Sequence, residues 1–145
     1  RSNVKGTFVP TKYAAAQFRR QRSGRIVNVT TDAGLGDIGH SSDAAASEAI
    51  IGMTRSVARD LGKYGVTCNA IAHDATVEDA ENTAALAVLL CTDAVPNVNG
   101  YLLGVRESSI FLYSNPAVER SVHRWGTFSM EEMDALAPAV FVSNP

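Results

Sequence analysis

Apolar residues recur along the chain with two different periods. Helical spacing of three and four residues marks three stretches, at residues 2–22, 43–63 and 78–91. Short runs rich in β-branched and apolar residues lie between and after them, at residues 25–31, 66–72 and 101–105, and such runs are typical of buried strands. Strands that alternate with helices predict an α/β fold with a parallel sheet and right-handed crossovers.

Local signals support the boundaries of the long middle helix. Ser42 or Asp43 can cap its start, because both side chains accept hydrogen bonds from the first unpaired backbone N–H groups. Tyr64-Gly65 ends it, since glycine readily takes the left-handed conformation that follows a helix. The side chains expected to face the core follow helical spacing: Ile50, Met53 or Thr54, Val57 and Leu61.

The periodicity weakens after the last predicted strand. We therefore divide the chain into a domain, residues 1–113, and a C-terminal tail, residues 114–145, which is a candidate for contacts with a partner. One short helix is predicted in the tail, over residues 129–136, because Ser129 and Glu132 have the spacing of a capping box.

Composition and charge narrow the class of protein. Apolar residues make up 46% of the chain and charged residues 19%, which is typical of a globular protein. The net charge of −2 provides no broad positive field, so we expect no nucleic-acid partner. The apolar runs are too short to span a membrane or to form the core of a signal peptide. We therefore expect a cytoplasmic protein with no membrane contact.

Cysteines and histidines give no sign of a metal site. Cys68 and Cys91 lie far apart, without the spacing of metal ligands or the density of a disulfide framework, and we expect both to be small core residues. His40 and His73 have no histidine, cysteine or carboxylate at ligand spacing. We predict no metal.

Five segments, taken in order, resemble the short-chain dehydrogenase/reductase family. They are residues 3–8, 24–29 with 33–34, 44–46, 52–62 and 65–72. Each segment alone is a weak signal, but the five together cover roughly the first hundred residues in the family's order. The resemblance implies a Rossmann-like, doubly wound parallel sheet, an NAD or NADP cofactor, and hydride transfer to or from a carbon bearing a hydroxyl.

The family's catalytic positions hold altered residues in this chain. The family uses an asparagine, a serine, a tyrosine and a lysine, and these positions match Asn3, Thr31, Asp43 and Ser47. A carboxyl group has a shorter reach than tyrosine and an ordinary pKa about six units lower. Ser47 has no charge with which to lower a neighbour's pKa or to hold the nicotinamide ribose. The resemblance therefore predicts a site without catalysis, in which Asp43 serves to cap its helix.

The family's glycine-rich phosphate loop belongs to the N-terminal half of its domain, and that half is not in this sequence. Gly34, Gly36 and Gly39 have similar spacing but follow the wrong strand, so we interpret them as loop residues. We expect no cofactor bound by this chain alone, and NAD or NADP if an N-terminal half exists.

The resemblance also implies association. In the family, the helix with the asparagine and the helix with the tyrosine pack against the same pair in another subunit, and apolar Phe8, Phe18, Met53 and Val57 offer contact area here. We expect a homo-oligomer, or a hetero-oligomer with a catalytically intact relative.

Three functions agree with these observations. The first is a catalytically degenerate subunit, a pseudoenzyme or scaffold, of an oligomeric dehydrogenase. The tail between residues 112 and 126 resembles a branch of the family that acts on hydroxyacyl-CoA thioesters, as in the benzylsuccinyl-CoA pathway of anaerobic toluene degradation. The second is an NAD(P)-dependent oxidoreductase of a secondary alcohol or ketone whose N-terminal half lies outside this chain. The third is a ligand-binding module that keeps the cleft without turnover.

Overall fold

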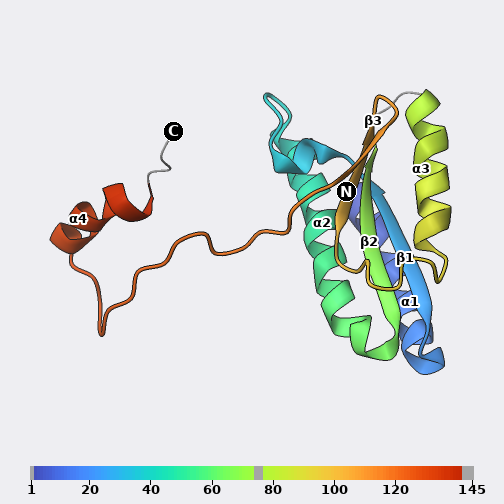
Figure 1. The fold of residues 1–145 in the computed structure, drawn as a ribbon, viewed down its shortest axis with the longest axis horizontal. Helices are drawn as coiled ribbons and strands as arrows, with labels where there is room; N and C mark the ends of the chain where they lie inside the picture. Colours follow the sequence, from blue (N-terminus) through green and yellow to red (C-terminus); the bar gives the residue numbers. More distant parts are fainter. Residues whose placement is uncertain (1, 74–76, 142–145) are drawn as a thin grey trace. The chain divides into compact units, whose positions relative to one another are not determined.

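The computed structural model describes residues 2–73 and 77–141 (Figure 1). Its helices are α1 (Ser2–Gln21), α2 (Ser41–Leu61), α3 (Val77–Leu90) and α4 (Met130–Val140), with short 3-10 turns η1 (Asp32–Leu35) and η2 (Gly62–Tyr64). Its strands are β1 (Gly24–Thr30), β2 (Val66–His73), β3 (Leu102–Arg106) and β4 (Ser109–Leu112). The chain divides into two compact units, Arg1–Asn115 and Pro116–Pro145.

The first unit is built on one sheet with the strand order β1-β2-β3-β4. β1 and β2 run parallel, with Gly24 opposite Val66 and Thr30 opposite Ala72, and β3 runs parallel to β2. The predicted α/β class, the three predicted strands and their parallel pairing are therefore confirmed.

β4 was not predicted from the sequence. It pairs antiparallel with β3 through a tight turn at Glu107 and Ser108, which have φ angles of 48° and 63°. Glycine or asparagine usually occupies such left-handed positions in a hairpin turn. Because neither residue is present there, the sequence carries no hairpin signal.

The two faces of the sheet are covered by different helices (Figure 1). On one face, Ile26 and Cys68 pack in a cluster with Ala58 of α2 and, at its margin, Phe18 of α1. On the other face, Ile71 of β2 packs in a second cluster with the side chains of α3. Both faces of a parallel sheet are apolar, so both need such cover.

This arrangement corrects the prediction of two right-handed crossovers. β1, β2 and β3 follow one another in one direction across the sheet. Two crossovers of the same hand would then place α2 and α3 on the same face, but the core clusters place them on opposite faces. One of the two connections is therefore left-handed, against the usual preference.

α2 begins earlier than predicted. Its first residue is Ser41 and its N-cap is His40, whose side chain makes no capping hydrogen bond. The expectation that Ser42 or Asp43 caps the helix was wrong. Asp43 lies within the first turn instead, where a negative charge is still favoured by the helix dipole.

The buried face of α2 also differs in part from the predicted stripe. Ile50, Thr54 and Leu61 are buried as expected, whereas Met53 and Val57 are only half-buried. The other buried side chains of α2 are Ser47, Ile51 and Ala58. Ile51 and Ala58 pack in core clusters with side chains of the sheet, and α2 also contacts α1.

The second unit contains α4 and the segment before it. Ser129 is the N-cap of α4: its side chain accepts a hydrogen bond from the Glu132 backbone N–H, and the Glu132 carboxylate accepts one from the Ser129 N–H at 2.7 Å. The predicted capping box is confirmed. Of the helices in residues 2–73 and 77–141, none is both long enough and apolar enough to cross a membrane.

We predict that the two cysteines differ sharply in reactivity. Cys68 is fully buried, and burial raises the pKa of its thiol from 9.0 to about 12, whereas Cys91 is exposed. The expectation that Cys91 is a core residue was therefore wrong. A disulfide reagent at pH 8 should modify one thiol in the folded chain and both in denaturant. Rapid reaction of Cys68 in the folded chain would contradict this assignment.

The same pKa shift predicts an alkaline loss of stability. Between about pH 9 and 12 the unfolded Cys68 thiol ionises while the folded one stays protonated. The free energy of unfolding should then fall by up to about 1.4 kcal/mol per pH unit from this group alone, and should be unaffected by it below pH 9. Urea unfolding of the wild type and Cys68→Ala at matched pH values isolates this slope, because the other titrating groups are common to both.

Candidate functional site

Three parallel strands end at the same edge of the sheet. Thr31 and Asp32 follow β1, His73 ends β2 and Arg106 ends β3. In open α/β folds, ligands bind at the carboxyl ends of the parallel strands. This edge is therefore the first place to look for a functional site.

A cavity of about 210 Å³ opens beside the end of β1. It is lined by Asn3, Thr7, Val29, Thr30, Thr31, Ala46, Ser47 and Ile50. The Thr31 Oγ1 and Ser47 Oγ atoms are 2.9 Å apart and form a hydrogen bond. The fold thus brings together three of the four residues that the sequence nominated.

Asp43 is the exception. It does not line this cavity; it is exposed in the first turn of α2, and its backbone N–H donates to the His40 carbonyl at 3.0 Å. A carboxylate at this position lies one helical turn before Ser47. The aspartate side chain is shorter than a tyrosine side chain, so its carboxylate does not reach the place where a tyrosine hydroxyl would enter the cavity.

The cavity lining is polar but uncharged. Its polar side chains are hydroxyls and one amide, and none of its lining residues ionises near neutral pH. The Thr30 hydroxyl is buried and has no hydrogen-bond partner among the described residues. Such a lining can hold a small neutral polar group by hydrogen bonds, but it offers no acid or base for proton transfer.

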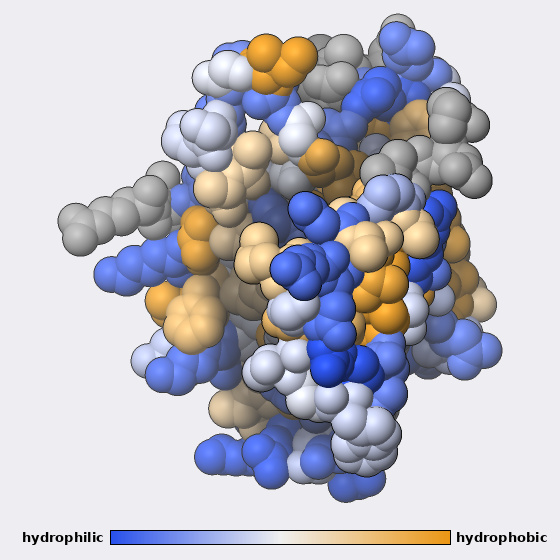
Figure 2. Space-filling model, turned by 90° about the vertical axis from the view of Figure 1, so that its left-hand side faces the viewer, coloured by the Kyte–Doolittle hydropathy of each residue, from blue (hydrophilic) through white to orange (hydrophobic). Residues whose placement is uncertain are grey.

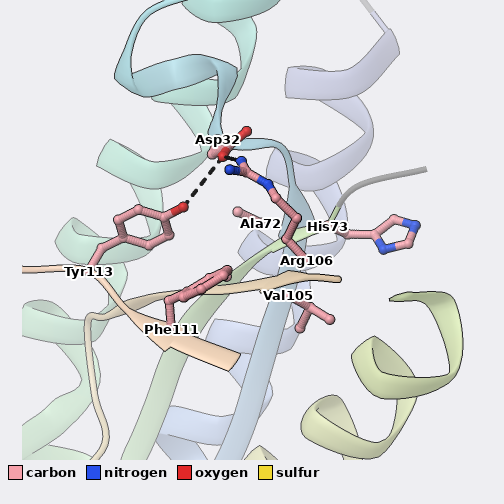
Figure 3. A pocket seen from close by; sticks show the side chains of 8 residues that line it. Asp32, Ala72, His73, Val105, Arg106, Phe111 and Tyr113 are labelled. Atoms are coloured by element: carbon pink, nitrogen blue, oxygen red, sulfur yellow. Dashed lines mark hydrogen bonds and ion pairs between the residues drawn. The ribbon is translucent and has the colours of Figure 1, made fainter. Parts of the chain in front are cut away.

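A second cluster lies at the same edge of the sheet (Figure 3). Asp32 forms an ion pair with Arg106, and the Tyr113 hydroxyl donates to Asp32 Oδ2 at 3.4 Å. The Phe111 and Tyr113 rings lie below this ion pair in the close-up. These contacts join the ends of β1 and β3 across the end of β2, with Ala72 between them.

Tyr113 is held in its protonated form. Burial raises the pKa of its hydroxyl above the ordinary value of 10.0, and the negative charge of Asp32 raises it further. The Tyr113 hydroxyl therefore donates a hydrogen bond to Asp32 and is a poor proton acceptor. His73 points away from this cluster, toward α3, and its Nδ1 lies 3.1 Å from Thr83 Oγ1 (Figure 3).

Sequence reasoning did not single out Asp32, Arg106 or Tyr113. Asp32 and Arg106 each follow or end a predicted strand, and that position alone could have nominated them. Tyr113 carries no such signal, because it reaches the site only through the unpredicted strand β4.

Comparison with known proteins identifies the family. Residues 1–86 match the sequence profile of the short chain dehydrogenase family, so the chain belongs to the short-chain dehydrogenases. A crystal structure of a short chain dehydrogenase from Mycobacterium avium has a TM-score of 0.85 and 28% identity, covering 99% of this chain and 55% of that one. The predicted Rossmann-like fold is confirmed by this likeness.

Two curated relatives each match about half of this chain. A 3-oxoacyl-[acyl-carrier-protein] reductase of Synechocystis is 42% identical over 71 residues, which are 48% of this chain and 29% of that protein. The (2S)-[(R)-hydroxy(phenyl)methyl]succinyl-CoA dehydrogenase subunit BbsD of Thauera aromatica is 39% identical over 70 residues, 48% of this chain and 28% of that protein. The matched segment thus covers less than a third of the length of either relative.

The family's nicotinamide cofactor does not fit the described cavity residues by themselves. The cavity lining contains no cation and no glycine-rich turn for a pyrophosphate. Its hydroxyls could hydrogen-bond a ribose, but Ser47 supplies no positive charge. No group of three or more histidine, cysteine or acidic residues that could hold a metal occurs in the part of the chain that the structure describes.

We predict that the stability losses caused by Ser47→Ala and Thr31→Val are not additive, because the two side chains share one hydrogen bond. Ser47→Ala should lower the free energy of unfolding by about 1 kcal/mol, because exposed Thr31 can turn to water. Thr31→Val should cost about 1–3 kcal/mol, since it leaves the buried Ser47 hydroxyl unpaired. The double variant should cost less than the sum of the two in urea unfolding.

Ser56→Ala provides the matched control. Ser56 lies on the same helix and is exposed, and its hydroxyl donates to the Gly52 carbonyl at 3.0 Å. Its substitution should change stability by less than about 0.5 kcal/mol. Strict additivity of Ser47→Ala and Thr31→Val would show that the two hydroxyls do not interact in solution.

Proposed function

We propose that this chain is a catalytically degenerate subunit, a pseudoenzyme or scaffold, of an oligomeric short-chain dehydrogenase. The observation that carries the proposal is the uncharged cavity at the end of β1. Asn3, Thr31 and Ser47 meet there as the resemblance implies. The architecture of the site is kept, while the groups that would transfer a proton are absent from its lining.

The ionisable groups nearby do not replace the lost ones. Asp32 is paired with Arg106, and the raised pKa of Tyr113 disfavours the phenolate that a base would need. Asp43 is exposed outside the cavity lining. Loss of one general acid or base typically lowers a rate by about 10² to 10⁴, so we expect no useful hydride transfer by this chain alone.

One of the relatives suggests a substrate class for the whole assembly. BbsD is a subunit of a dehydrogenase whose substrate is a succinyl-CoA derivative with a hydroxyl group. We propose that the complex containing this chain acts on a hydroxyacyl-CoA thioester of this kind, as in the benzylsuccinyl-CoA pathway, and that an intact partner subunit carries NAD or NADP. The free cysteines suit a reducing compartment, so we place the complex in the cytoplasm.

One observation favours a second candidate, an NAD(P)-dependent oxidoreductase with a separate N-terminal half. β1 is an edge strand of the described sheet, and Val29 on it is 52% exposed. A cavity of about 370 Å³ runs between β1 and α1. A further parallel strand could bind there and bring a phosphate-binding loop with it, which would supply the cofactor site.

Two of the four side chains expected to contact a partner pack within their own subunit. Phe18 and Val57 pack against the core cluster of their own subunit, so they offer little area to a partner. Phe8, in contrast, is 51% exposed on α1. Its side chain is the better probe of a contact between subunits.

The test of lost catalysis is a direct assay of the purified chain. With NAD(H) or NADP(H) and hydroxyacyl-CoA or secondary-alcohol substrates, we expect no turnover above the buffer rate. Asp43→Tyr combined with Ser47→Lys should bind no nicotinamide and show no activity, because the described residues lack a phosphate site. Turnover by the unmodified chain that Asp43→Ala abolishes would overturn the proposal.

A gain of activity in the double variant would show that the chain binds a nicotinamide by itself, and would contradict the expectation that it lacks a cofactor site. Circular dichroism of the double variant checks that it folds. The Thr31→Val change in the same background serves as control, because it should abolish any restored reaction that uses this cavity.

A further inference from the structure

Another cavity, of about 150 Å³, lies between α2 and the segment that leads into the amino-terminal end of β3. It is lined by Arg55, Ala58, Arg59, Asn99, Gly100 and Asn115. The lining contains two guanidinium groups and no carboxylate. It therefore differs from the cavity at the end of β1, whose lining is uncharged.

Charged side chains alone do not mark a site on this protein. Hydrophilic residues are prominent across the face drawn in the space-filling view (Figure 2), and most exposed charges of a folded chain are simply hydrated. The arginines of this cavity are unusual in their spacing. Arg55 and Arg59 are four residues apart on α2, so they are neighbours on the helix surface, and like charges at that spacing destabilise a helix.

The guanidinium of Arg55 is largely withdrawn from water but incompletely paired. Its side chain is 18% exposed. Nε donates to Asn115 Oδ1 at 3.3 Å, and Nη1 lies 3.4 Å from Glu48 Oε1. Both contacts are longer than the roughly 2.7–2.9 Å of a strong charge-assisted hydrogen bond. Because a guanidinium carries several further N–H donors, Arg55 can still bind another acceptor.

The rest of the lining combines an available cation with a fixed wall. Arg59 forms no hydrogen bond or ion pair with any residue that the structure describes. Asn99, in contrast, is fully engaged: its Oδ1 accepts from the Cys68 N–H at 2.8 Å, and its Nδ2 donates to the Ala58 carbonyl at 3.2 Å. Gly100 is buried with a φ angle of 83°, and a Cβ there would lie 3.3 Å from the Ala58 Cβ. The wall opposite the arginines is therefore held by the core.

We infer that this cavity binds a phosphate group. The groups still available in its lining are donors: the two guanidiniums and the NH₂ of Asn115, whose oxygen is taken by Arg55. Phosphate supplies both the acceptor oxygens and the negative charge, and arginine binds it through pairs of parallel hydrogen bonds.

The size of the cavity agrees with a single phosphate group. Pockets for drug-sized ligands usually measure about 300–1,000 Å³, whereas 150 Å³ corresponds to the volume of about five water molecules. Arg59 is exposed, so the remainder of a phosphate ester could extend past it into solvent. The ligand is therefore either a free phosphate ion or the phosphate of a nucleotide ester.

Calorimetric titration of the purified full chain at low ionic strength tests the inference and separates the two sources. Inorganic phosphate should bind with a stoichiometry of one, and acetate should bind at least about tenfold more weakly, because it has fewer acceptor oxygens and less charge. Coenzyme A and dephospho-coenzyme A differ by one phosphate monoester. Tighter binding of coenzyme A than of both dephospho-coenzyme A and inorganic phosphate would identify a nucleotide ester as the ligand.

Three variants test the residues. Arg59→Gln should weaken the binding of inorganic phosphate at least about tenfold, since it removes a charge-assisted contact. Glu48→Gln should strengthen it several-fold, because the carboxylate that competes for Arg55 is removed. Arg20→Gln, at an exposed position of α1, makes the same change in net charge as Arg59→Gln and should leave the affinity within about twofold. Phosphate should raise the unfolding midpoint of the wild type and of Arg20→Gln, but not that of Arg59→Gln.

The opposite outcomes are equally specific. A folded wild type that binds neither inorganic phosphate nor coenzyme A overturns the inference. Equal losses in Arg59→Gln and Arg20→Gln would show a response to net charge and no site at this cavity. Acetate that binds as well as phosphate would contradict the assignment of the ligand, and an unchanged affinity in Glu48→Gln would contradict the role of Arg55. Because binding is measured directly, these results are independent of the proposed loss of catalysis and of the oligomeric state.

Discussion

The burial of β2 on both faces is the constraint on which the rest of the molecule depends. Cys68, Ala70 and Ile71 are completely buried, and strands pair along both edges of β2. Because its side chains alternate between the faces, β2 needs α1 and α2 on one side and α3 on the other. That requirement overrides the usual handedness of one crossover, since a crossover of the same hand would have left Ile71 and its neighbours in water.

The same packing determines where the cavity at the end of β1 lies. α2 lies against the sheet through Ile51 and Ala58, and this contact brings Ser47 to the end of β1, where it meets Thr31 at 2.9 Å. The geometry of the cavity therefore follows from the core and not from the identity of the polar residues. Substitution at positions 43 and 47 can remove an acid and a base while leaving the strand ends, the helix and the cavity in place.

Charge is distributed unequally over the elements that remain exposed. α1 is basic, α4 is acidic, and both carry large apolar side chains in contact with water. Exposed aromatic residues beside charges of one sign are typical of contact surfaces, because burial supplies affinity and charge selects the partner. The charges on α1 and α4 are thus opposite in sign, whereas the lining of the cavity at the end of β1 is uncharged.

Local sequence determined the parts of this protein that depend on neighbours along the chain. The periodicity placed three helices and three parallel strands, the Ser129–Glu132 spacing defined the start of α4, and five ordered segments indicated the family and nominated Asn3, Thr31 and Ser47. Tertiary structure alone decided the rest. The Asp32–Arg106–Tyr113 cluster joins residues 74 and 81 positions apart, β4 forms on β3 without a turn signal, and α3 covers the second face of the sheet. The cluster, the strand β4 and the position of α3 all depend on which surfaces the packed sheet leaves uncovered. Residues that are neighbours along the chain do not indicate those surfaces.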